Sequence, residues 1–124
     1  MAKSQIEFEP RYVEPRYVIT LWAGLYPAPH RLASGPGFDF EWEELAKENK
    51  RKLLDIVGET GLGYTLSDCT GHYSFVNEPS VKLEFIVASH DVPVVSALAK
   101  RYVEAAEQDC VYLTSRMEEL AIIA

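Results

Sequence analysis

Three side chains that could hold a cation or donate a hydrogen bond follow one another in the middle of the sequence. Asp68, Tyr73 and Glu78 all fall within residues 67–87. Two carboxylates and a phenol at this spacing could reach one side of a β-hairpin, where the carboxylates would attract a positively charged small molecule. An exposed carboxylate beside a strand pair is as often simply hydrated, and both interpretations stay open on local evidence.

The residues around these side chains predict the hairpin itself. Along residues 81–87, apolar and other side chains alternate with the period of a half-buried strand. The apolar set is Val81, Leu83, Phe85 and Val87, and the other set is Lys82, Glu84 and Ile86. We expect the turn at the polar residues 77–80. In the preceding run, Gly71 indicates a β-bulge or a close approach of another backbone.

Other kinds of chemistry find little support in the sequence. The three histidines, His30, His72 and His90, are scattered, and no metal site is expected. The two cysteines, Cys69 and Cys110, have neither metal-ligand spacing nor the pattern of a disulfide framework, which favours a reducing cytoplasm. No glycine-rich phosphate-binding motif is present.

Length and composition indicate one ordinary globular domain. The chain has 124 residues, of which 48% are hydrophobic and 25% charged, with a net charge of −7. The acidic balance argues against nucleic acid, which binds clustered Lys and Arg, and suits a cationic small molecule. No apolar run approaches the roughly 20 residues that cross a bilayer, and no export signal is visible.

The first half of the chain predicts an arm, a strand, a loop and a helix. Residues 1–15 are polar and contain two prolines, which predicts a flexible arm before a single domain at 16–124. Bulky β-favouring residues predict a strand at 16–26. A loop rich in Pro and Gly follows at 24–38, and loops of this length are often lids or binding loops. Apolar residues at helical spacing predict a helix over 39–57.

Capping residues predict where the helices begin and end. Asp39 has the side chain of an N-cap, and Gly58 and Gly61 can end the first helix. Asp91 is predicted to cap a second helix, with Pro93 tolerated in its first turn.

The order of elements predicts a ferredoxin-like α+β fold. A last strand is expected at 110–114, and the apolar residues 120–123 predict a further strand or a subunit contact. The order is then βαββαβ, an antiparallel sheet with both helices on one face. The other face would be left bare, and oligomerisation would cover it.

Two short motifs occur in order in the second half of the chain. Residues 67–73 contain D-x-T-G-x-Y, and residues 107–111 read E-Q-D-C-V. Both resemble the small phage-encoded S-adenosylmethionine lyases, formerly named S-adenosylmethionine hydrolases. Glu78 is placed where that family's essential glutamate begins the third strand. The likeness covers roughly residues 60–124, with a weaker echo at 16–23.

The resemblance implies a PII-like homotrimer with substrate sites between subunits. It implies cleavage of S-adenosylmethionine to 5′-methylthioadenosine and L-homoserine lactone in the bacterial host's cytoplasm, without a cofactor or metal, as a counter-defence against restriction systems. The implied catalytic residues are Glu78 and Tyr73, and the implied substrate-binding residues are Asp68, Thr70, Glu107 and Glu84. Because the connection before Glu78 is shorter than in some relatives, Glu84 is the alternative for the essential carboxylate.

Two other functions stay open beside this one. The chain could be a non-catalytic trimeric ferredoxin-like sensor of a small metabolite. It could also be a structural or inhibitory phage protein that binds a host enzyme through its acidic surface.

Overall fold

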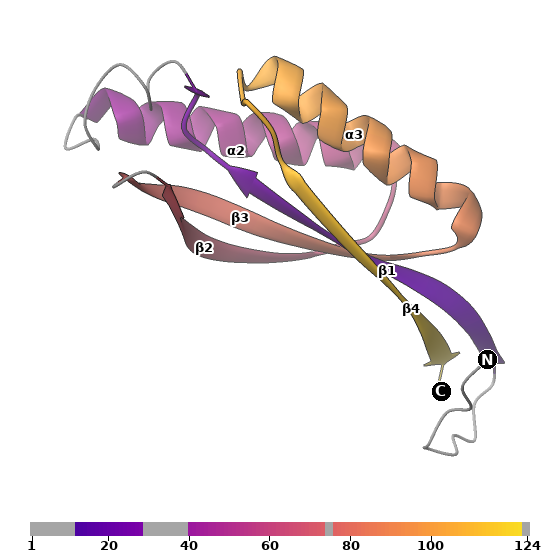
Figure 1. The fold of residues 1–124 in the computed structure, drawn as a ribbon. Helices are drawn as coiled ribbons and strands as arrows, with labels where there is room; N and C mark the ends of the chain where they lie inside the picture. The colour runs from indigo at the N-terminus through magenta and orange to yellow at the C-terminus, as the bar shows by residue number, and fades with distance from the viewer. Residues whose placement is uncertain (1–11, 29–39, 74–75, 123–124) are drawn as a thin grey trace.

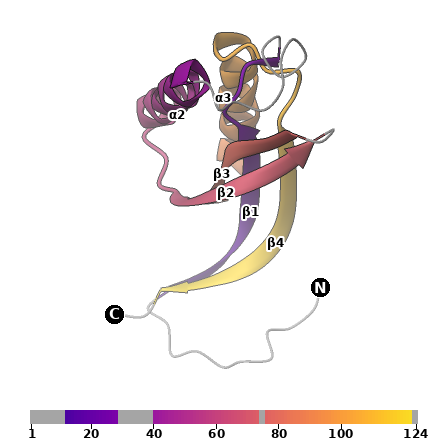
Figure 2. The same ribbon diagram turned by 90° about the vertical axis from the view of Figure 1, so that its left-hand side faces the viewer.

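The predicted ferredoxin-like fold is confirmed. The structure, a computed structural model, describes residues 12–28, 40–73 and 76–122. Its elements are β1 (Tyr12–Gly24), α2 (Phe40–Thr60), β2 (Thr65–Tyr73), β3 (Val76–Val87), the 3-10 turn η1 (Ser89–Asp91), α3 (Val92–Ala105) and β4 (Tyr112–Ile122). The strands form an antiparallel sheet in the order β2-β3-β1-β4. Both helices lie on one side of this sheet (Figures 1 and 2).

The alternation along β3 decides which side of the sheet packs against the helices. Val81, Leu83 and Phe85 are fully buried in the core, as predicted, whereas Ile86 is exposed. The side chains of residues 78, 80, 82 and 84 have the opposite parity and face away from the helices. We call this side of the sheet the open face.

The first strand begins earlier than the sequence predicts. β1 begins at Tyr12, so residues 12–15, which were expected in the arm, belong to the sheet. The proline in this part, Pro15, pairs with Glu119 of β4, whereas pairing with β3 starts only at Tyr17. Pro15 therefore lies where β1 has one neighbour, a position that tolerates a residue without an N–H.

The last strand is much longer than the predicted strand at 110–114. β4 runs from Tyr112 to Ile122, so the apolar tail at 120–123 continues this strand and is no separate element. All eleven residues of β4 pair with β1. Its middle is polar and exposed, because β4 is an edge strand beyond the cover of the helices, and the apolar alternation that marks a strand in a sequence is missing there.

The helix boundaries agree with the sequence in part. α2 continues through Gly58 and ends before Gly61, whose φ of 72° is the left-handed conformation common after a helix. Asp91 stands at the N-cap of α3, with Pro93 in the first turn, but its side chain makes no capping hydrogen bond because η1 leads directly into the helix. The predicted N-cap Asp39 lies outside the described residues.

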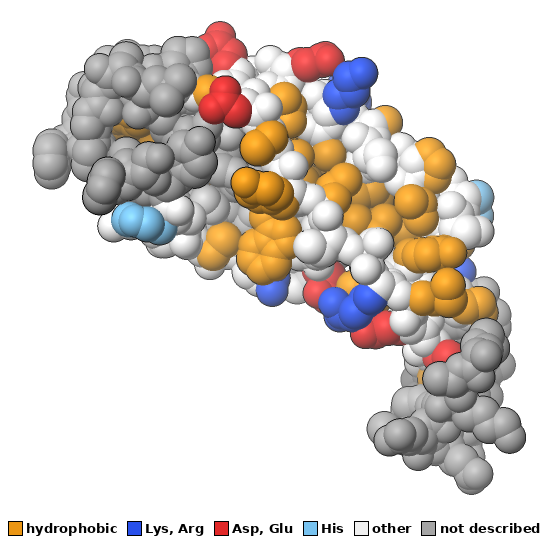
Figure 3. Space-filling view, in the orientation of Figure 1, with side chains coloured by type: hydrophobic (Ala, Val, Ile, Leu, Met, Phe, Trp, Pro, Cys, Tyr) orange, Lys and Arg blue, Asp and Glu red, His pale blue; other side chains and the backbone are white. Residues whose placement is uncertain are grey.

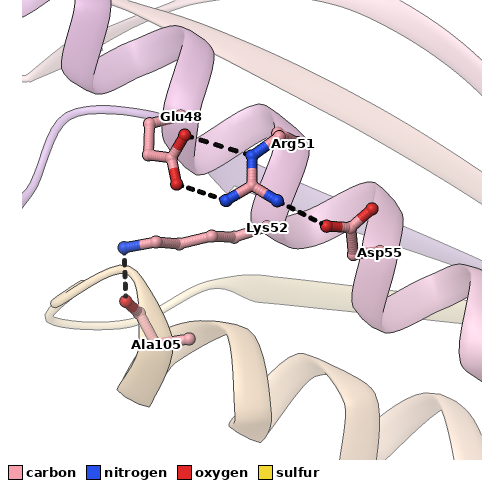
Figure 4. Close-up of polar contacts among 5 residues, drawn as sticks. All are labelled: Glu48, Arg51, Lys52, Asp55 and Ala105. Carbon is pink, nitrogen blue, oxygen red and sulfur yellow. Dashed lines mark hydrogen bonds and ion pairs between the residues drawn. The ribbon is translucent and has the colours of Figure 1, made fainter.

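Polar contacts hold the end of α3 and thereby the connection to β4. Lys52 of α2 donates a hydrogen bond to the carbonyl of Ala105 at 3.1 Å, and cations are favourable at a helix C-terminus (Figure 4). Beyond that end, Glu107 has a φ of 54°, and the N–H of Gln108 donates to the carbonyl of Val103 at 3.0 Å. This is the Schellman pattern of helix termination, and it fixes the direction in which residues 108–110 leave the helix.

Candidate functional site

A pocket of about 340 Å³ lies at one end of the open face. It is formed where the end of β1 meets the hairpin of β2 and β3 and the connection between α3 and β4. The lining residues are Trp22, Ala23, Gly24, Cys69, Thr70, Gly71, His72, Glu78, Ser80, Val81, Gln108, Asp109, Cys110 and Tyr112. Its volume is in the range of small-molecule sites.

The hairpin supplies the floor of this pocket, and its turn differs from the prediction. Residues 77–80, which were expected to form the turn, belong to β3. Gly71 pairs with Glu78 in an unbroken register, so there is no bulge. A Cβ on Gly71 would lie 3.0 Å from the side-chain hydroxyl of Ser80, whereas the nearest backbone atom, the carbonyl oxygen of Glu78, would be 3.8 Å away, so the close contact is with a side chain and not with another backbone.

Glu78 is the buried carboxylate of the pocket, with 6% of its surface exposed. Its Oε2 accepts a hydrogen bond from the N–H of Tyr26 at 2.9 Å. The neighbouring strand makes room for it at Gly24, where a Cβ would lie 2.5 Å from Oε1. The glycine that ends β1 therefore allows the carboxylate to lie against the backbone.

The segment after β1 is held in place from three sides. The N–H of Leu25 donates to the carbonyl of Pro79 at 3.0 Å, and the side-chain amide of Asn49 donates to the carbonyl of Leu25 at 2.8 Å. The side-chain amide of Gln108 donates to the carbonyl of Tyr26 at 2.7 Å. These contacts fix the N–H of Tyr26, which in turn positions Glu78.

The charge of Glu78 also affects the pKa of Tyr26. Burial raises the pKa of the Tyr26 phenol, and the carboxylates of Glu43 and Glu78 raise it further. The phenol therefore stays neutral at physiological pH. Its ring packs edge-on against Trp42 with 4.7 Å between the ring centroids, which anchors the segment in the core.

The structure brings two of the sequence-predicted site residues into this pocket, Glu78 and Thr70. Asp68 faces the other way and pairs with Lys50 of α2 at 2.9 Å. The backbone of Tyr73 pairs with Val76 at the tip of the hairpin, and its side chain lies outside the described residues.

The two remaining candidates lie outside the lining. Glu84 pairs across the sheet with Thr20 and Thr65, farther along β3. The pKa of Arg116 is raised mainly by its hydrogen bond to Glu118, with Glu84 adding a smaller effect through its charge. The carbonyl of Glu107 accepts a hydrogen bond from the N–H of Ala28 at 2.8 Å, so this residue holds the backbone beside the pocket.

Several pocket residues were not singled out from the sequence. Gly24 and Gln108 contribute through packing and hydrogen bonds that only the folded chain brings together. Trp22 and Tyr112 are aromatic residues of the lining that are 41% and 67% exposed. A glycine that ends a strand is the one signal that could have found Gly24.

The chemistry of the lining favours a cation with an apolar or aromatic part. It contains two acidic residues, Glu78 and Asp109, and no Lys or Arg among the described residues. The ring of Tyr112 provides a face that suits a flat ring or a cation, whereas the Trp22 ring already has the Lys82 ammonium 5.3 Å from its centroid. Within the described ranges, no three His, Cys, Asp or Glu side chains gather in a way that could hold a metal ion. None of the described helices is long and apolar enough to span a membrane.

Comparisons with known proteins support the fold. No family model matches the sequence, and no curated protein matches it. Among solved structures, a nitrogen regulatory PII-like protein from Thiomonas intermedia K12, bound to ADP, AMP and bicarbonate, is 12% identical with a TM-score of 0.56, covering 91% of this chain and 100% of that one. A phage SAM lyase in complex with S-methyl-5′-thioadenosine is 18% identical with a TM-score of 0.55, covering 86% and 89%.

A phage SAM lyase in the apo state is 16% identical with a TM-score of 0.52, covering 95% of this chain and 96% of that one. At these identities the likeness establishes a shared fold, and the pocket has to decide between the activities.

Proposed function

We propose that this chain is an S-adenosylmethionine lyase, which cleaves S-adenosyl-L-methionine to 5′-methylthioadenosine and L-homoserine lactone. The observation that carries the proposal is the charge of the pocket: its lining contains a buried carboxylate, Glu78, together with two aromatic residues, and no Lys or Arg among the described residues. S-adenosylmethionine carries a sulfonium and an ammonium beside a purine ring. Such a pocket complements both parts of this molecule.

In the proposed reaction the protein supplies neither the nucleophile nor the leaving group. The substrate contains its own nucleophile, the carboxylate, and its own leaving group, the thioether attached through the sulfonium. The carboxylate oxygen attacks the γ-carbon, the bond from that carbon to sulfur breaks, and the electron pair leaves with methylthioadenosine. Holding the chain in the folded conformation can contribute about 7–11 kcal/mol in favourable intramolecular cases.

Glu78 has the role of holding the cationic part of the substrate. Its carboxylate is fixed by the N–H of Tyr26 and is shielded from water, so its attraction to a cation is stronger than at an exposed position. In this proposal Tyr73, at the tip of the hairpin, orients the amino-acid end of the substrate, and Thr70 contacts the substrate in the pocket. Asp68, Glu107 and Glu84 act less directly, through the position of the strands.

The second candidate is a non-catalytic nucleotide sensor, which the shared fold with the PII-like protein favours. A nucleotide such as ADP brings several negative charges, and phosphate sites in proteins use Lys, Arg or the N-terminus of a helix. The described lining supplies two carboxylates instead. The pocket therefore supports the sulfonium substrate over the nucleotide.

We expect the protein to be a homotrimer, with the pocket completed by a neighbouring subunit. The motive is the open face, which neither α2 nor α3 covers, and the large apolar side chains exposed on the described surface. These are Trp22, Tyr64, Ile86, Tyr112, Leu113 and Met117. Figure 3 shows hydrophobic side chains gathered over β4 and the adjoining part of α3. Light scattering at micromolar protein should give three times the 14.0 kDa of the chain, and a stable monomer would refute the assembly.

A product assay separates the candidate functions. Purified protein is incubated with S-adenosylmethionine, and methylthioadenosine is followed by chromatography; in parallel, binding of ADP and AMP is measured by calorimetry. The lyase predicts product and weak nucleotide binding. Tight binding of ADP or AMP without product would support the sensor. Neither product nor binding would leave the third interpretation, a protein that acts by binding a host enzyme. Product formation in cells would deplete the methyl donor on which restriction systems depend.

A further inference from the structure

Tyr112 is a large aromatic side chain of the pocket that the rest of the described chain leaves uncovered. It is 67% exposed and belongs to the lining. In the described part of the chain, its side chain makes no hydrogen bond, ring contact or cation–π contact. A single exposed apolar side chain is common on a protein surface. A ring that lines a pocket, however, offers a π face and apolar area that a ligand can cover.

The exposure of this ring follows from its place in the sheet. Tyr112 is the first residue of β4, which is an edge strand and pairs with β1 on one side only. Its partner in the register is Trp22, which has a neighbouring strand on both sides. The ammonium of Lys82 lies 5.3 Å from the centroid of the Trp22 ring. Of these two rings of the lining, Tyr112 is therefore the one whose faces are left for a ligand.

The ring stands apart from the buried carboxylate of the pocket. Oε1 of Glu78 lies 2.5 Å from the position that a Cβ of Gly24 would have, so the carboxylate is beside the last residue of β1. Tyr112 is level with Trp22, two residues back along β1, and one strand across. These two steps separate the positions by about 8 Å. A ligand that reaches from one to the other has to be elongated, with different groups at its two ends.

We propose that the Tyr112 ring is the platform on which the purine of the ligand stacks. The inference rests on the proposed function for the identity of the ligand and deepens it by assigning the base-binding end of the pocket. Stacking of a base on an aromatic side chain uses the π face that every base has, so it needs no polar partner. In S-adenosylmethionine the ribose separates the purine from the sulfonium, so the purine can cover Tyr112 while the cationic part lies toward the acidic end.

The probe is 5′-methylthioadenosine, because it contains the purine, carries no positive charge and is not cleaved in the proposed reaction. It is titrated calorimetrically into the wild type, Tyr112→Phe and Tyr112→Leu. Leu keeps an apolar side chain but removes the π face, so we expect binding roughly five- to a hundredfold weaker, as for the loss of one stack between a base and an aromatic ring. Phe keeps the ring and should bind within about twofold of the wild type. Wild-type affinity in Tyr112→Leu, or no binding to the wild type, would overturn the proposal.

Tyr64 provides the matched control, because it is a second exposed tyrosine. It is 40% exposed and lies outside the lining, with its ring centroid 6.2 Å from that of Phe85. Tyr64→Leu makes the same chemical change on the same protein and should leave the affinity for methylthioadenosine within about twofold of the wild type. If both Leu variants lose the same affinity, the loss reports a general effect on the fold, and the role of Tyr112 is refuted.

A neighbouring copy of the chain could cover the same ring, and two further measurements separate this contact from the stack. In the wild type with bound methylthioadenosine, nuclear Overhauser contacts should link the purine protons to the Tyr112 ring. Light scattering should give Tyr112→Leu the molar mass of the wild type. The absence of the Overhauser contacts overturns the proposal, and a lower molar mass of Tyr112→Leu would then identify the ring as a subunit contact.

The outcome is independent of turnover. A protein that binds methylthioadenosine through Tyr112 but never cleaves S-adenosylmethionine would refute the lyase and support the stacking platform. A protein that cleaves the substrate, with a Tyr112→Leu variant that binds methylthioadenosine as tightly as the wild type, would support the lyase and refute the role of Tyr112.

Discussion

Replacing Glu78 with Gln should lower the turnover of S-adenosylmethionine by about a hundredfold or more while leaving the fold intact. The variant keeps the size of the side chain, and its amide oxygen can still accept the hydrogen bond from the N–H of Tyr26. It removes the charge that would hold the cationic part of the substrate in the pocket. Losing one fixed electrostatic contact in an enzyme site typically costs a factor of 10² to 10³ in rate. Initial rates of methylthioadenosine formation measure the effect.

Glu84→Gln is the control for this substitution. Glu84 lies on the same strand and has the same parity as Glu78, but it is outside the pocket lining. Its replacement removes an equal charge from the open face, and turnover should stay within about twofold of the wild type, as expected for a partly exposed charge outside the pocket. If Glu84→Gln is inactive and Glu78→Gln is fully active, the pocket residue has been assigned incorrectly.

Replacing Gly24 with Ala should lower turnover by about a hundredfold through displacement of the Glu78 carboxylate. The added Cβ would lie 2.5 Å from Oε1 and 2.6 Å from Oε2, so the carboxylate has to swing away. Because it is the end of a flexible side chain, the backbone can stay in place, but the N–H of Tyr26 loses its acceptor. Misplacing a catalytic group by about 1 Å can cost a factor of 10². The lost hydrogen bond should destabilise the fold by about 1–3 kcal/mol.

The same substitution at Gly58, outside the pocket, separates the expected effect on turnover from the expected effect on stability. Gly58 lies inside α2, and nothing is within 4 Å of the position where its Cβ would be. Gly58→Ala should therefore stabilise the protein by about 0.5–1 kcal/mol, since glycine is a poor residue for a helix interior, and turnover should not change. Urea denaturation and initial rates of both variants test this pair. Full activity of Gly24→Ala would mean that the position of the carboxylate is unimportant.

The strand β3 could be predicted because only one of its sides is buried, whereas the length of the exposed strand β4 could not. The alternation of Val81, Leu83 and Phe85 marks a strand because one of its sides packs against the helices. β4 carries no such signal in its polar middle, and it forms because its backbone pairs with β1 along its whole length. Pairing between distant backbones leaves little trace in side-chain types.

The site could be predicted from sequence only in part, for a similar reason. Thr70 was found through the motif at 67–73 and Glu78 through its expected place in the third strand, and both line the pocket. Gly24 and Gln108 line the same pocket although they are far apart in the sequence, and both act through the segment that contains Tyr26. Their roles depend on which backbone groups lie next to them, which only the tertiary structure supplies.

Cleavage of S-adenosylmethionine in water labelled with ¹⁸O, followed by mass spectrometry at early times, is the most direct test of the central claim. If the substrate's own carboxylate attacks the γ-carbon, homoserine lactone appears first and contains no label, and label enters the carboxyl group only when the lactone opens. Internal attack needs no activated water, which is why this route suits a pocket whose buried carboxylate, Glu78, holds a cation. Homoserine labelled at the γ-hydroxyl, with no lactone at any time, would contradict this mechanism, and a reaction without any methylthioadenosine would contradict the proposed function itself.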